Sequence, residues 1–280
     1  MQIADELIEM AQRIAREIEL PEIEEIILPE PGVAGISDAE FAAVCLRDGS
    51  MGFFYTLLDD TAQRLRDEIM PEAWCGRPPL DLALQYAARD ALARSMGLGA
   101  ISAITQSLFN RAGYAPDTRT NSMAKMAFSP DDHVGMVGFF PRLVERLRTQ
   151  RVHLTVIEKN AAFLQQGEAF RVTLDAAELV ACNKILCTAA TLLNDSLDEI
   201  LAHCGHATRV AVIGPTAGCL PDPLFARGVD AVGGSRVADA ALLKGRLREQ
   251  REWAEAVQKY TIEKDVYPGF ARLLRRASRS

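Results

Sequence analysis

Residues 209–218 read RVAVIGPTAG, an apolar run that ends in a loop of glycine, proline and threonine. Three more runs of this design occur upstream: HVGMVG at 133–138, LTVIE at 154–158 and ILCTAAT at 185–191. The stretches between them have the pattern of helices, and this alternation predicts an α/β fold with a parallel sheet and crossover helices. Because the carboxyl ends of parallel strands share one edge, we expect the four loops to meet at a ligand site.

The first 120 residues have a different pattern, which is typical of an α+β unit. Apolar residues at three- and four-residue steps predict a helix over 2–19. An Asp-Gly turn between the apolar runs 41–46 and 51–57 predicts a hairpin, and 23–28 is predicted as a further strand. Helices are predicted over 61–69, 80–96 and, as a buried helix, 97–108.

The segment 110–130 is rich in Gly, Pro, Asn, Ser and Thr, a composition that favours a linker or a long surface loop. We therefore predict two domains, 1–120 and 121–280. The second would also contain a fifth apolar run at 229–232.

A charged helix is predicted near the C-terminus, over 245–262. Trp253, Val257 and Tyr260 would lie on one face of it.

The composition restricts the classes of partner and compartment. The net charge is −7, with 38 acidic against 31 basic side chains, which argues against a nucleic-acid surface. No apolar run approaches the ~18 residues needed to cross a membrane, and the acidic N-terminus lacks the order of a signal peptide. We expect a cytoplasmic protein whose six cysteines are free thiols. Its apolar N-terminal helix is compatible with a homodimer.

The first loop of the predicted sheet combines a glycine with an acid on the next strand. Gly138 permits close backbone approach, and the helix after it favours anions. Glu158 lies 158 − 138 = 20 residues later, the spacing at which an acid binds the ribose of a dinucleotide. The motif is only G-x-x-G, however, and Phe139 crowds the turn. These three residues are candidates for ligand binding, with a plain strand-end charge as the alternative for Glu158.

Hydroxyl and amide side chains follow the third and fourth runs. Thr188, Thr191 and Asn194 begin at a strand end, and the last two would lie about one helical turn apart, facing one crevice. Neutral donors of this kind suit a carboxylate, a phosphate or a sugar. Helix capping by a threonine is the alternative, and both roles are compatible. Thr216 in the fourth loop is a further candidate.

Two places in the sequence are candidates for metal binding. Cys219 is the only cysteine in a predicted site loop, so it is the candidate reactive thiol or soft-metal ligand, with close packing as the alternative. His203-Cys204-Gly205-His206 gathers further ligand types, with a helix end as the alternative. Asp239 either lines another edge loop or caps the next helix.

Four motifs together resemble the bacterial and archaeal family labelled "putative heavy-metal chelation": VGMVGFFP, LTVIEKN, CTAATLLNDSLDEIL and VAVIGPTAGCLPDPLFARGVDAVGG. The stretch RSMGLGAISAI, which begins at Arg94, resembles the helix that ends the enolase-like part of this family. The resemblance covers nearly the whole chain. It implies an enolase-like N-terminal domain, a Rossmann-like C-terminal domain and a site in the cleft between them. The site residues it implies are the Gly138 turn, Glu158, Thr188, Thr191, Asn194 and Thr216, with Ser196 where the family leads us to expect a threonine.

These observations leave three hypotheses for function. The first is the handling of a transition or heavy metal, or of a small chelator that carries one. There Cys219 would be a soft donor, Glu158 a hard donor, and Thr191 and Asn194 would orient the ligand.

The second hypothesis is an enzyme with a nucleotide-like or S-adenosylmethionine-like cofactor held by Gly138 and Glu158. The threonine-asparagine loop and Thr216 would then hold its substrate. A third is a subunit that binds a partner protein through the Trp253 helix. The sequence leaves open whether the chain catalyses a reaction.

Overall fold

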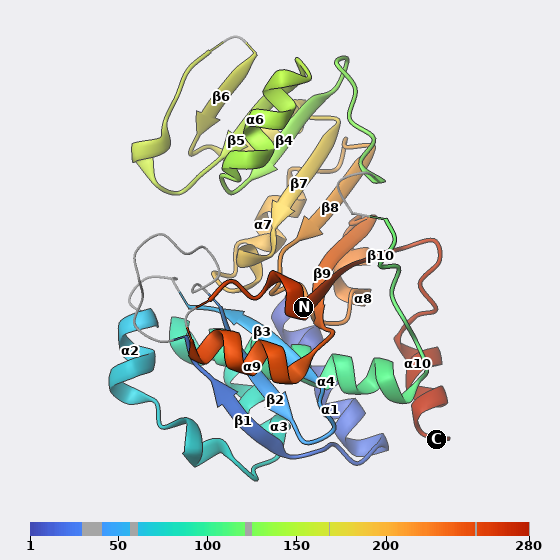
Figure 1. Cartoon of the computed structure of the whole chain (residues 1–280). Helices are drawn as coiled ribbons and strands as arrows, with labels where there is room; N and C mark the ends of the chain where they lie inside the picture. Colours follow the sequence, from blue (N-terminus) through green and yellow to red (C-terminus); the bar gives the residue numbers. More distant parts are fainter. Residues whose placement is uncertain (30–40, 57–60, 121–124, 168, 250, 280) are drawn as a thin grey trace.

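Two sheets organise the chain in the computed structural model, which describes residues 1–29, 41–56, 61–120, 125–167, 169–249 and 251–279. One has seven strands and is mostly parallel, and the other has three antiparallel strands (Figure 1). The predicted α/β class, with a smaller α+β part at the N-terminus, is confirmed. Among the described residues, no helix is long and apolar enough to span a bilayer.

The large sheet has the strand order β10-β9-β8-β7-β4-β5-β6. Its strands are β4 (His133–Val137), β5 (His153–Ile157), β6 (Phe170–Thr173), β7 (Lys184–Thr188), β8 (Arg209–Ile213), β9 (Ala231–Val237) and β10 (Val257–Glu263). All neighbouring pairs are parallel except β9 and β10. The first strand of the unit, β4, lies inside the sheet, so the order reverses between β4 and β7.

The strands of the large sheet are apolar along their length because both faces are covered. Val134 and Met136 of β4 pack on α6 (Pro141–Thr149). On the other face, a Cβ on Gly135 would lie 2.6 Å from Leu179 of η5 (Ala176–Ala181), so the glycine permits close packing.

The N-terminal part has a helix, three strands and a long buried helix. α1 (Ile3–Glu17) is followed by β1 (Ile23–Ile27) and by the predicted hairpin of β2 (Phe41–Leu46) and β3 (Met51–Tyr55). Gly49 in the hairpin turn has φ +82°, a conformation that favours glycine.

The helices between β3 and β4 differ from the prediction. They are α2 (Thr61–Glu68), η2 (Pro71–Trp74), α3 (Pro79–Ala83), η3 (Leu84–Ala87) and α4 (Ala91–Arg111). The predicted division between 80–96 and 97–108 is wrong, because Ala88 is extended and Asp90 caps a new helix by accepting a bond from the Ala93 N–H at 2.9 Å. α4 then runs unbroken through both ranges.

The predicted helix over 245–262 is also wrong. The segment contains the end of α9 (Ala240–Arg248), the short turn η7 (Ala254–Ala256) and strand β10. β10 pairs with β9 over seven residues, and its β-branched and aromatic side chains suit a strand. Asp239 does cap α9, since its Oδ1 accepts a bond from the Leu242 N–H at 2.9 Å.

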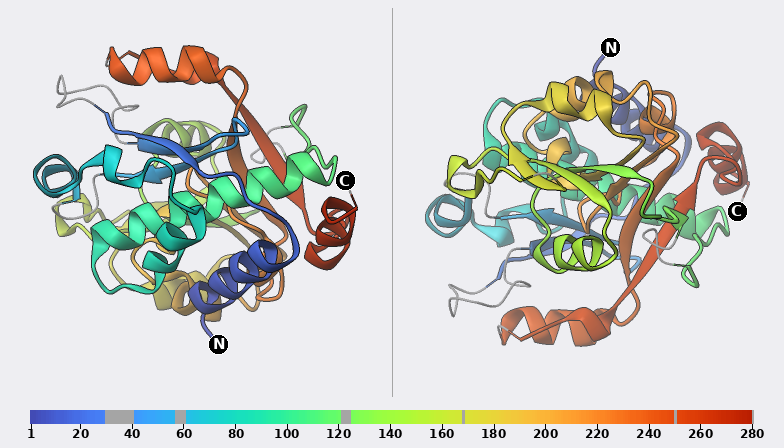
Figure 2. Two further views of the ribbon diagram at one scale, coloured as in Figure 1. Left: turned by 90° about the horizontal axis from the view of Figure 1, so that it is seen from below. Right: turned by 90° about the horizontal axis from the view of Figure 1, so that it is seen from above.

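Trp253 is not available to a partner on a helix, because it is 5% exposed and stacks on Phe53 of β3. Figure 2 shows the small sheet between α9 on one side and α4 on the other. The remaining helices are η4 (Ala161–Phe163), η6 (Ala189–Leu192), α7 (Leu197–Ala202), α8 (Asp222–Phe225) and α10 (Phe270–Ala277).

The two parts of the chain share one core. The largest cluster of buried apolar residues includes Leu98 and Ile104 of α4 together with Cys187 and Val212 of the large sheet. The carboxyl ends of β7 and β8 point toward α4 and the small sheet (Figure 1). The loops that follow these strands therefore lie at the junction between the parts.

Candidate functional site

The loops after β4 and β7 touch where the strand order of the large sheet reverses. Gly138 follows β4 with φ +88°, and a Cβ on it would lie 2.9 Å from Cγ2 of Thr188, the last residue of β7. Only glycine allows this approach without a shift of the neighbour. In open α/β sheets, ligands bind outside the carboxyl ends at such a reversal.

The β8 loop joins the same edge. Gly214 has φ +146°, and a Cβ on it would lie 3.2 Å from the Cβ of Ala189 in the β7 loop. Thr216, two residues further, is 3% exposed. Three of the four loops predicted to converge thus pack closely against one another at Gly138 and Gly214, and these loops include Thr188 and Thr216.

Glu158 makes internal contacts at the end of β5. Its Oε1 accepts a hydrogen bond from the Phe139 N–H at 2.7 Å, and its Oε2 accepts one from the Lys159 N–H at 3.0 Å. The carboxylate therefore ties the β4 turn to the β5 turn. The Phe139 ring stacks on Phe163 with 5.4 Å between the ring centroids.

Thr188, the last residue of β7, has the capping role that the sequence offered as the alternative, and Thr191 bonds within the same turn. Thr188 Oγ1 accepts a bond from the Ala190 N–H at 3.3 Å at the start of η6. Thr191 Oγ1 donates to the Thr188 carbonyl at 2.6 Å and is buried. The loop is a 3-10 turn and not the start of an α-helix, so Thr191 and Asn194 do not share a helix face.

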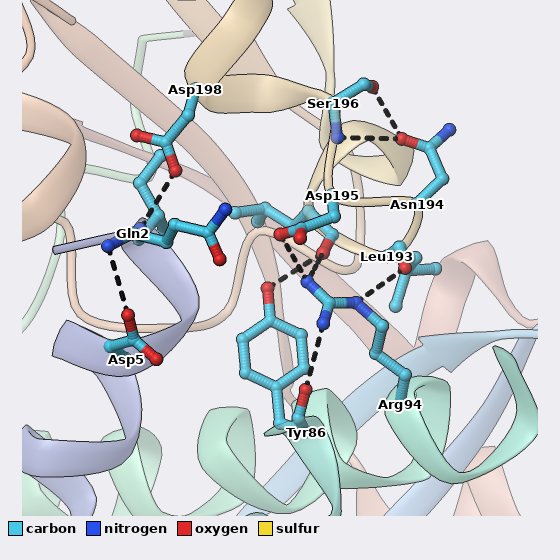
Figure 3. A network of polar contacts seen from close by, with 11 residues as sticks. Gln2, Asp5, Tyr86, Arg94, Leu193, Asn194, Asp195, Ser196 and Asp198 are labelled. Atoms are coloured by element: carbon cyan, nitrogen blue, oxygen red, sulfur yellow. Dashed lines mark hydrogen bonds and ion pairs between the residues drawn. The ribbon is translucent and has the colours of Figure 1, made fainter. Parts of the chain in front are cut away.

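Asn194 is half-buried at the end of this loop. Its Oδ1 accepts bonds from the N–H and Oγ of Ser196, at 3.2 and 2.5 Å. Its amide nitrogen points away from these two contacts (Figure 3). Nδ2 is therefore oriented to donate to something other than its own loop.

Arg94 of α4 holds this loop from the N-terminal part, a role the sequence analysis did not assign. Its guanidinium is buried and donates to the Leu193 carbonyl at 2.8 Å, to Asp195 Oδ1 at 2.7 Å and to the Tyr86 carbonyl at 3.1 Å (Figure 3). Tyr86 adds a bond from its hydroxyl to the Leu192 carbonyl at 2.8 Å. Asp195 itself has φ +59°, an uncommon conformation for a residue other than glycine.

The start of α1 holds the segment that follows the loop. Asp198, near the start of α7, accepts a bond from the Ile3 N–H at 2.9 Å and pairs with Arg227. Arg227 also pairs with Glu6 at 2.9 Å. The second half of the loop 188–196 and the segment that follows it are thus held by contacts across the junction.

The sequence model of the family described as "Putative heavy-metal chelation" matches residues 122–261, half of the chain. The chain belongs to this family. The match begins before β4 and ends within β10, so it includes all of the loops described above.

Other members of this family, DUF364, share the fold over nearly the whole chain. A crystal structure of a member from Desulfitobacterium hafniense, described as of unknown function, superposes with a TM-score of 0.69 at 19% identity, covering 93% of this chain and 100% of that one. A member from Pyrococcus horikoshii, also of unknown function, gives 0.64 at 19%, with 92% and 99% covered. An uncharacterized protein of Methanocaldococcus jannaschii is 27% identical over 183 residues, which are 62% of this chain and 67% of that protein.

The potential metal ligands among the described side chains do not fit a bare metal ion. Among the described residues, no group of three or more His, Cys, Asp or Glu side chains is arranged to hold one. This includes the segment His203 to His206 and the surroundings of Cys219. A metal site normally needs three or four such ligands from the protein.

The thiol of Cys219 is 1% exposed, and burial raises its pKa to about 12. Burial also raises the pKa of Cys204 to about 12. Metals bind the thiolate, which these environments disfavour. Cys75 is the exposed cysteine, and it lies in the N-terminal part, in the loop after η2.

Proposed function

We propose that this protein binds a metal that is already held by a small, oxygen-rich chelator. The site would lie at the carboxyl edge of the large sheet, where it meets the N-terminal part. Gly138, Phe139 and Glu158 would form one side of it, and Thr188, Thr191, Asn194 and Thr216 the other. The family description supports a link to metals at this coarse level.

One observation carries the preference for a chelate over a free ion. The loops gathered at the strand-order reversal bring neutral hydroxyl and amide groups, and the described residues offer no group of three metal ligands. Neutral donors bind the outer oxygens of a complex well, whereas an aqueous ion requires anionic or imidazole ligands. A chelate brings its own inner ligands and needs from the protein only hydrogen bonds and shape.

The residues would then divide into two roles. Asn194 Nδ2 and Thr216 Oγ1 would donate to ligand oxygens. Glu158, Thr188 and Thr191 would position the loops, because their polar atoms already bond within the protein. Cys219 is left out of this proposal because its thiol is buried and protonated at neutral pH.

A nucleotide-like cofactor at the same edge fits these contacts less well. In dinucleotide sites, the amides of the first turn bind the pyrophosphate and the acid on the second strand binds the ribose. Here the Phe139 amide and the Glu158 carboxylate bond each other at 2.7 Å. A nucleotide would have to separate two groups that already satisfy one another.

Mass spectrometry on freshly purified protein is the first test. We expect a native mass above the denatured mass by a few hundred daltons, with a metal isotope pattern in the released ligand. A bare-metal excess that a strong chelator removes would contradict the proposal, and so would an organic ligand without metal.

Equilibrium dialysis provides the second test, with Ni²⁺ alone and with the citrate complex of Ni²⁺ as probes. We expect the complex to bind and the free ion to bind at least ten-fold more weakly. Thr216→Val should weaken binding of the complex. Thr208→Val is the matched control. Thr208 lies just before β8, at the opposite edge of the sheet from the proposed site, and its hydroxyl donates to the Asn183 carbonyl.

A further inference from the structure

The connection between β5 and β6 has only the short turn η4 in its described residues, 158–167 and 169. Parallel neighbours are usually joined by a longer helix, which then covers one face of the sheet. In this connection, Phe163 is 45% exposed and Leu164 is 50% exposed. The β6 edge of the large sheet therefore presents large apolar side chains to the outside.

A groove of about 540 Å³ lies beside this edge. It begins at Phe139, whose ring stacks on Phe163, and it follows one side of α6. α6 lies across β4 and β5, at the end of the molecule remote from α1 and α10 (Figure 1). The groove and the exposed apolar side chains thus adjoin one another. Apolar and polar residues of the helix line the groove: Pro141, Val144, Glu145, Arg148 and Thr149.

Two opposite charges in this groove have no ion-pair partner among the described residues. Glu145 and Arg148 lie three residues apart on α6 but do not pair with each other. The guanidinium carbon of Arg148 instead lies 4.9 Å from the centre of the Phe170 ring. A guanidinium that is stacked on a ring keeps N–H groups at its edge for a carboxylate. The groove therefore fits a partner that presents the same two charges in the reverse order.

The groove residues of α6 are arranged symmetrically about the middle of the helix. A two-fold axis between residues 146 and 147 would place Glu145 opposite the partner's Arg148, and Val144 opposite the partner's Thr149. Each contact then occurs twice, because the same surface is used by both copies in a two-fold interface. The two unpaired charges thus complement each other in a pair of identical chains.

We propose that a second copy of this chain binds along the groove, with the two α6 helices antiparallel across a two-fold axis. Glu145 pairs with the partner's Arg148, and Arg148 pairs with the partner's Glu145. The antiparallel order brings Phe163 and Leu164 beside the C-terminal end of the partner's α6. Their apolar surface is then removed from water, which favours association.

The N-terminal helix is a poorer candidate for the dimer face. The apolar residues of α1, among them Leu7 and Ile14, are buried in the core of their own chain. The α6 groove also adjoins the proposed ligand site, since Phe139 lines the groove and its amide bonds Glu158. Association through α6 requires no ligand, so it stands apart from the proposed function.

Charge reversal in the full chain tests the reciprocal ion pairs. Sedimentation equilibrium should show a dimer for the natural protein at micromolar concentration. Glu145→Arg and Arg148→Glu each place like charges opposite one another twice, so each variant alone should dimerise at least about ten-fold more weakly. An equimolar mixture of the two variants should dimerise again, because each copy then meets opposite charges on the other.

Arg146→Glu is the matched control. Arg146 is exposed on the same helix but does not line the groove, so this variant should remain dimeric. Leu164→Ser removes apolar surface without a change in α6 and should weaken the dimer as well. Circular dichroism should show the natural helix content in every variant.

Three results would overturn the proposed dimer. One is a natural protein that is monomeric at all concentrations, and another is single charge variants that remain dimeric. The third is a mixture of folded charge variants that stays monomeric, because the two charges would then not face each other across a two-fold axis. If the charge variants do not fold, an unweakened dimer in Leu164→Ser would overturn the proposal.

Discussion

The carboxylate of Glu158 accepts a hydrogen bond from the backbone N–H of Phe139 at 2.7 Å and thereby joins the turns that follow β4 and β5. The two residues are 19 positions apart, on neighbouring parallel strands. An acid that would bind a ribose in a dinucleotide site acts here as an internal anion for the first turn. The Phe139 amide, which would bind a phosphate in a dinucleotide site, is therefore already occupied by a carboxylate of the protein itself.

Glu158→Gln should loosen this link. The amide oxygen can still accept from Phe139, but the NH₂ group cannot accept from Lys159, so one bond is lost. We expect the free energy of unfolding, measured in urea, to fall by about 1 kcal/mol. Affinity for the citrate complex of Ni²⁺ should also fall, because the β4 turn moves. Glu9→Gln on the exposed side of α1 is the control and should change neither. Tighter nucleotide binding by the Glu158 variant would mean that the amide of Phe139 is a phosphate site after all.

Gly138→Ala tests the close contact between the first and third loops. Alanine at φ +88° costs about 1–2 kcal/mol, and its Cβ would also clash with Thr188 Cγ2. Gly113→Ala measures the cost of the backbone conformation alone, because Gly113 has φ +60° and a Cβ on it would contact nothing. We expect Gly138→Ala to be the more destabilising of the two in urea unfolding.

A second substitution separates the clash from other causes. Thr188→Ser removes Cγ2 and keeps the hydroxyl that accepts from Ala190. The double variant Gly138→Ala with Thr188→Ser should therefore recover the difference between the two glycine variants. Failure to recover it would place the strain elsewhere in the turn.

The sequence was sufficient where one strong local signal decides the structure. β4, β5, β7 and β8 are continuous apolar runs buried on both faces, and each was predicted within a residue or two. β6 was missed because FRVT is short and contains Arg171. β10 was mistaken for a helix because Trp253, Val257 and Tyr260 also fit steps of three and four residues.

The site was less predictable, since its decisive contacts are long-range. The 20-residue spacing between Gly138 and Glu158 correctly predicted that the acid lies near the Gly138 turn. It could not show that the carboxylate accepts a hydrogen bond from the turn itself. Arg94 and Asp195 are 101 positions apart, and their pairing depends on how α4 packs against the large sheet. The available signal was a lone arginine in an apolar helix, which is rare without a partner.

Replacement of Arg94 should release the β7 loop. Arg94→Met leaves the carbonyls of Leu193 and Tyr86 and the carboxylate of Asp195 without a donor, which costs about 2–3 kcal/mol. Arg94→Lys retains the charge but not the fork of donors, so we expect a smaller loss. Urea unfolding measures both, and Arg89→Lys, at an exposed position just before α4, is the control. Equal losses for Lys and Met would show that the fork geometry carries the whole effect.

The buried thiols predict how stability depends on alkaline pH. The pKa of Cys219 is about 12 in the folded protein against 9.0 for a free thiol, so between these values the unfolded chain releases a proton that the folded chain keeps. Stability is therefore intact below pH 9 and falls as the pH rises toward 12, by up to about 1.4 kcal/mol per pH unit for each such thiol. The free energy of unfolding is measured in urea at pH 8, 9, 10 and 11. Cys219→Ala should reduce the slope of this free energy against pH by the equivalent of about one proton. Cys75→Ala, which removes an exposed thiol, should leave the slope unchanged. An unchanged slope in Cys219→Ala would mean that this thiol ionises in the folded protein, and it would restore Cys219 as a candidate soft-metal donor.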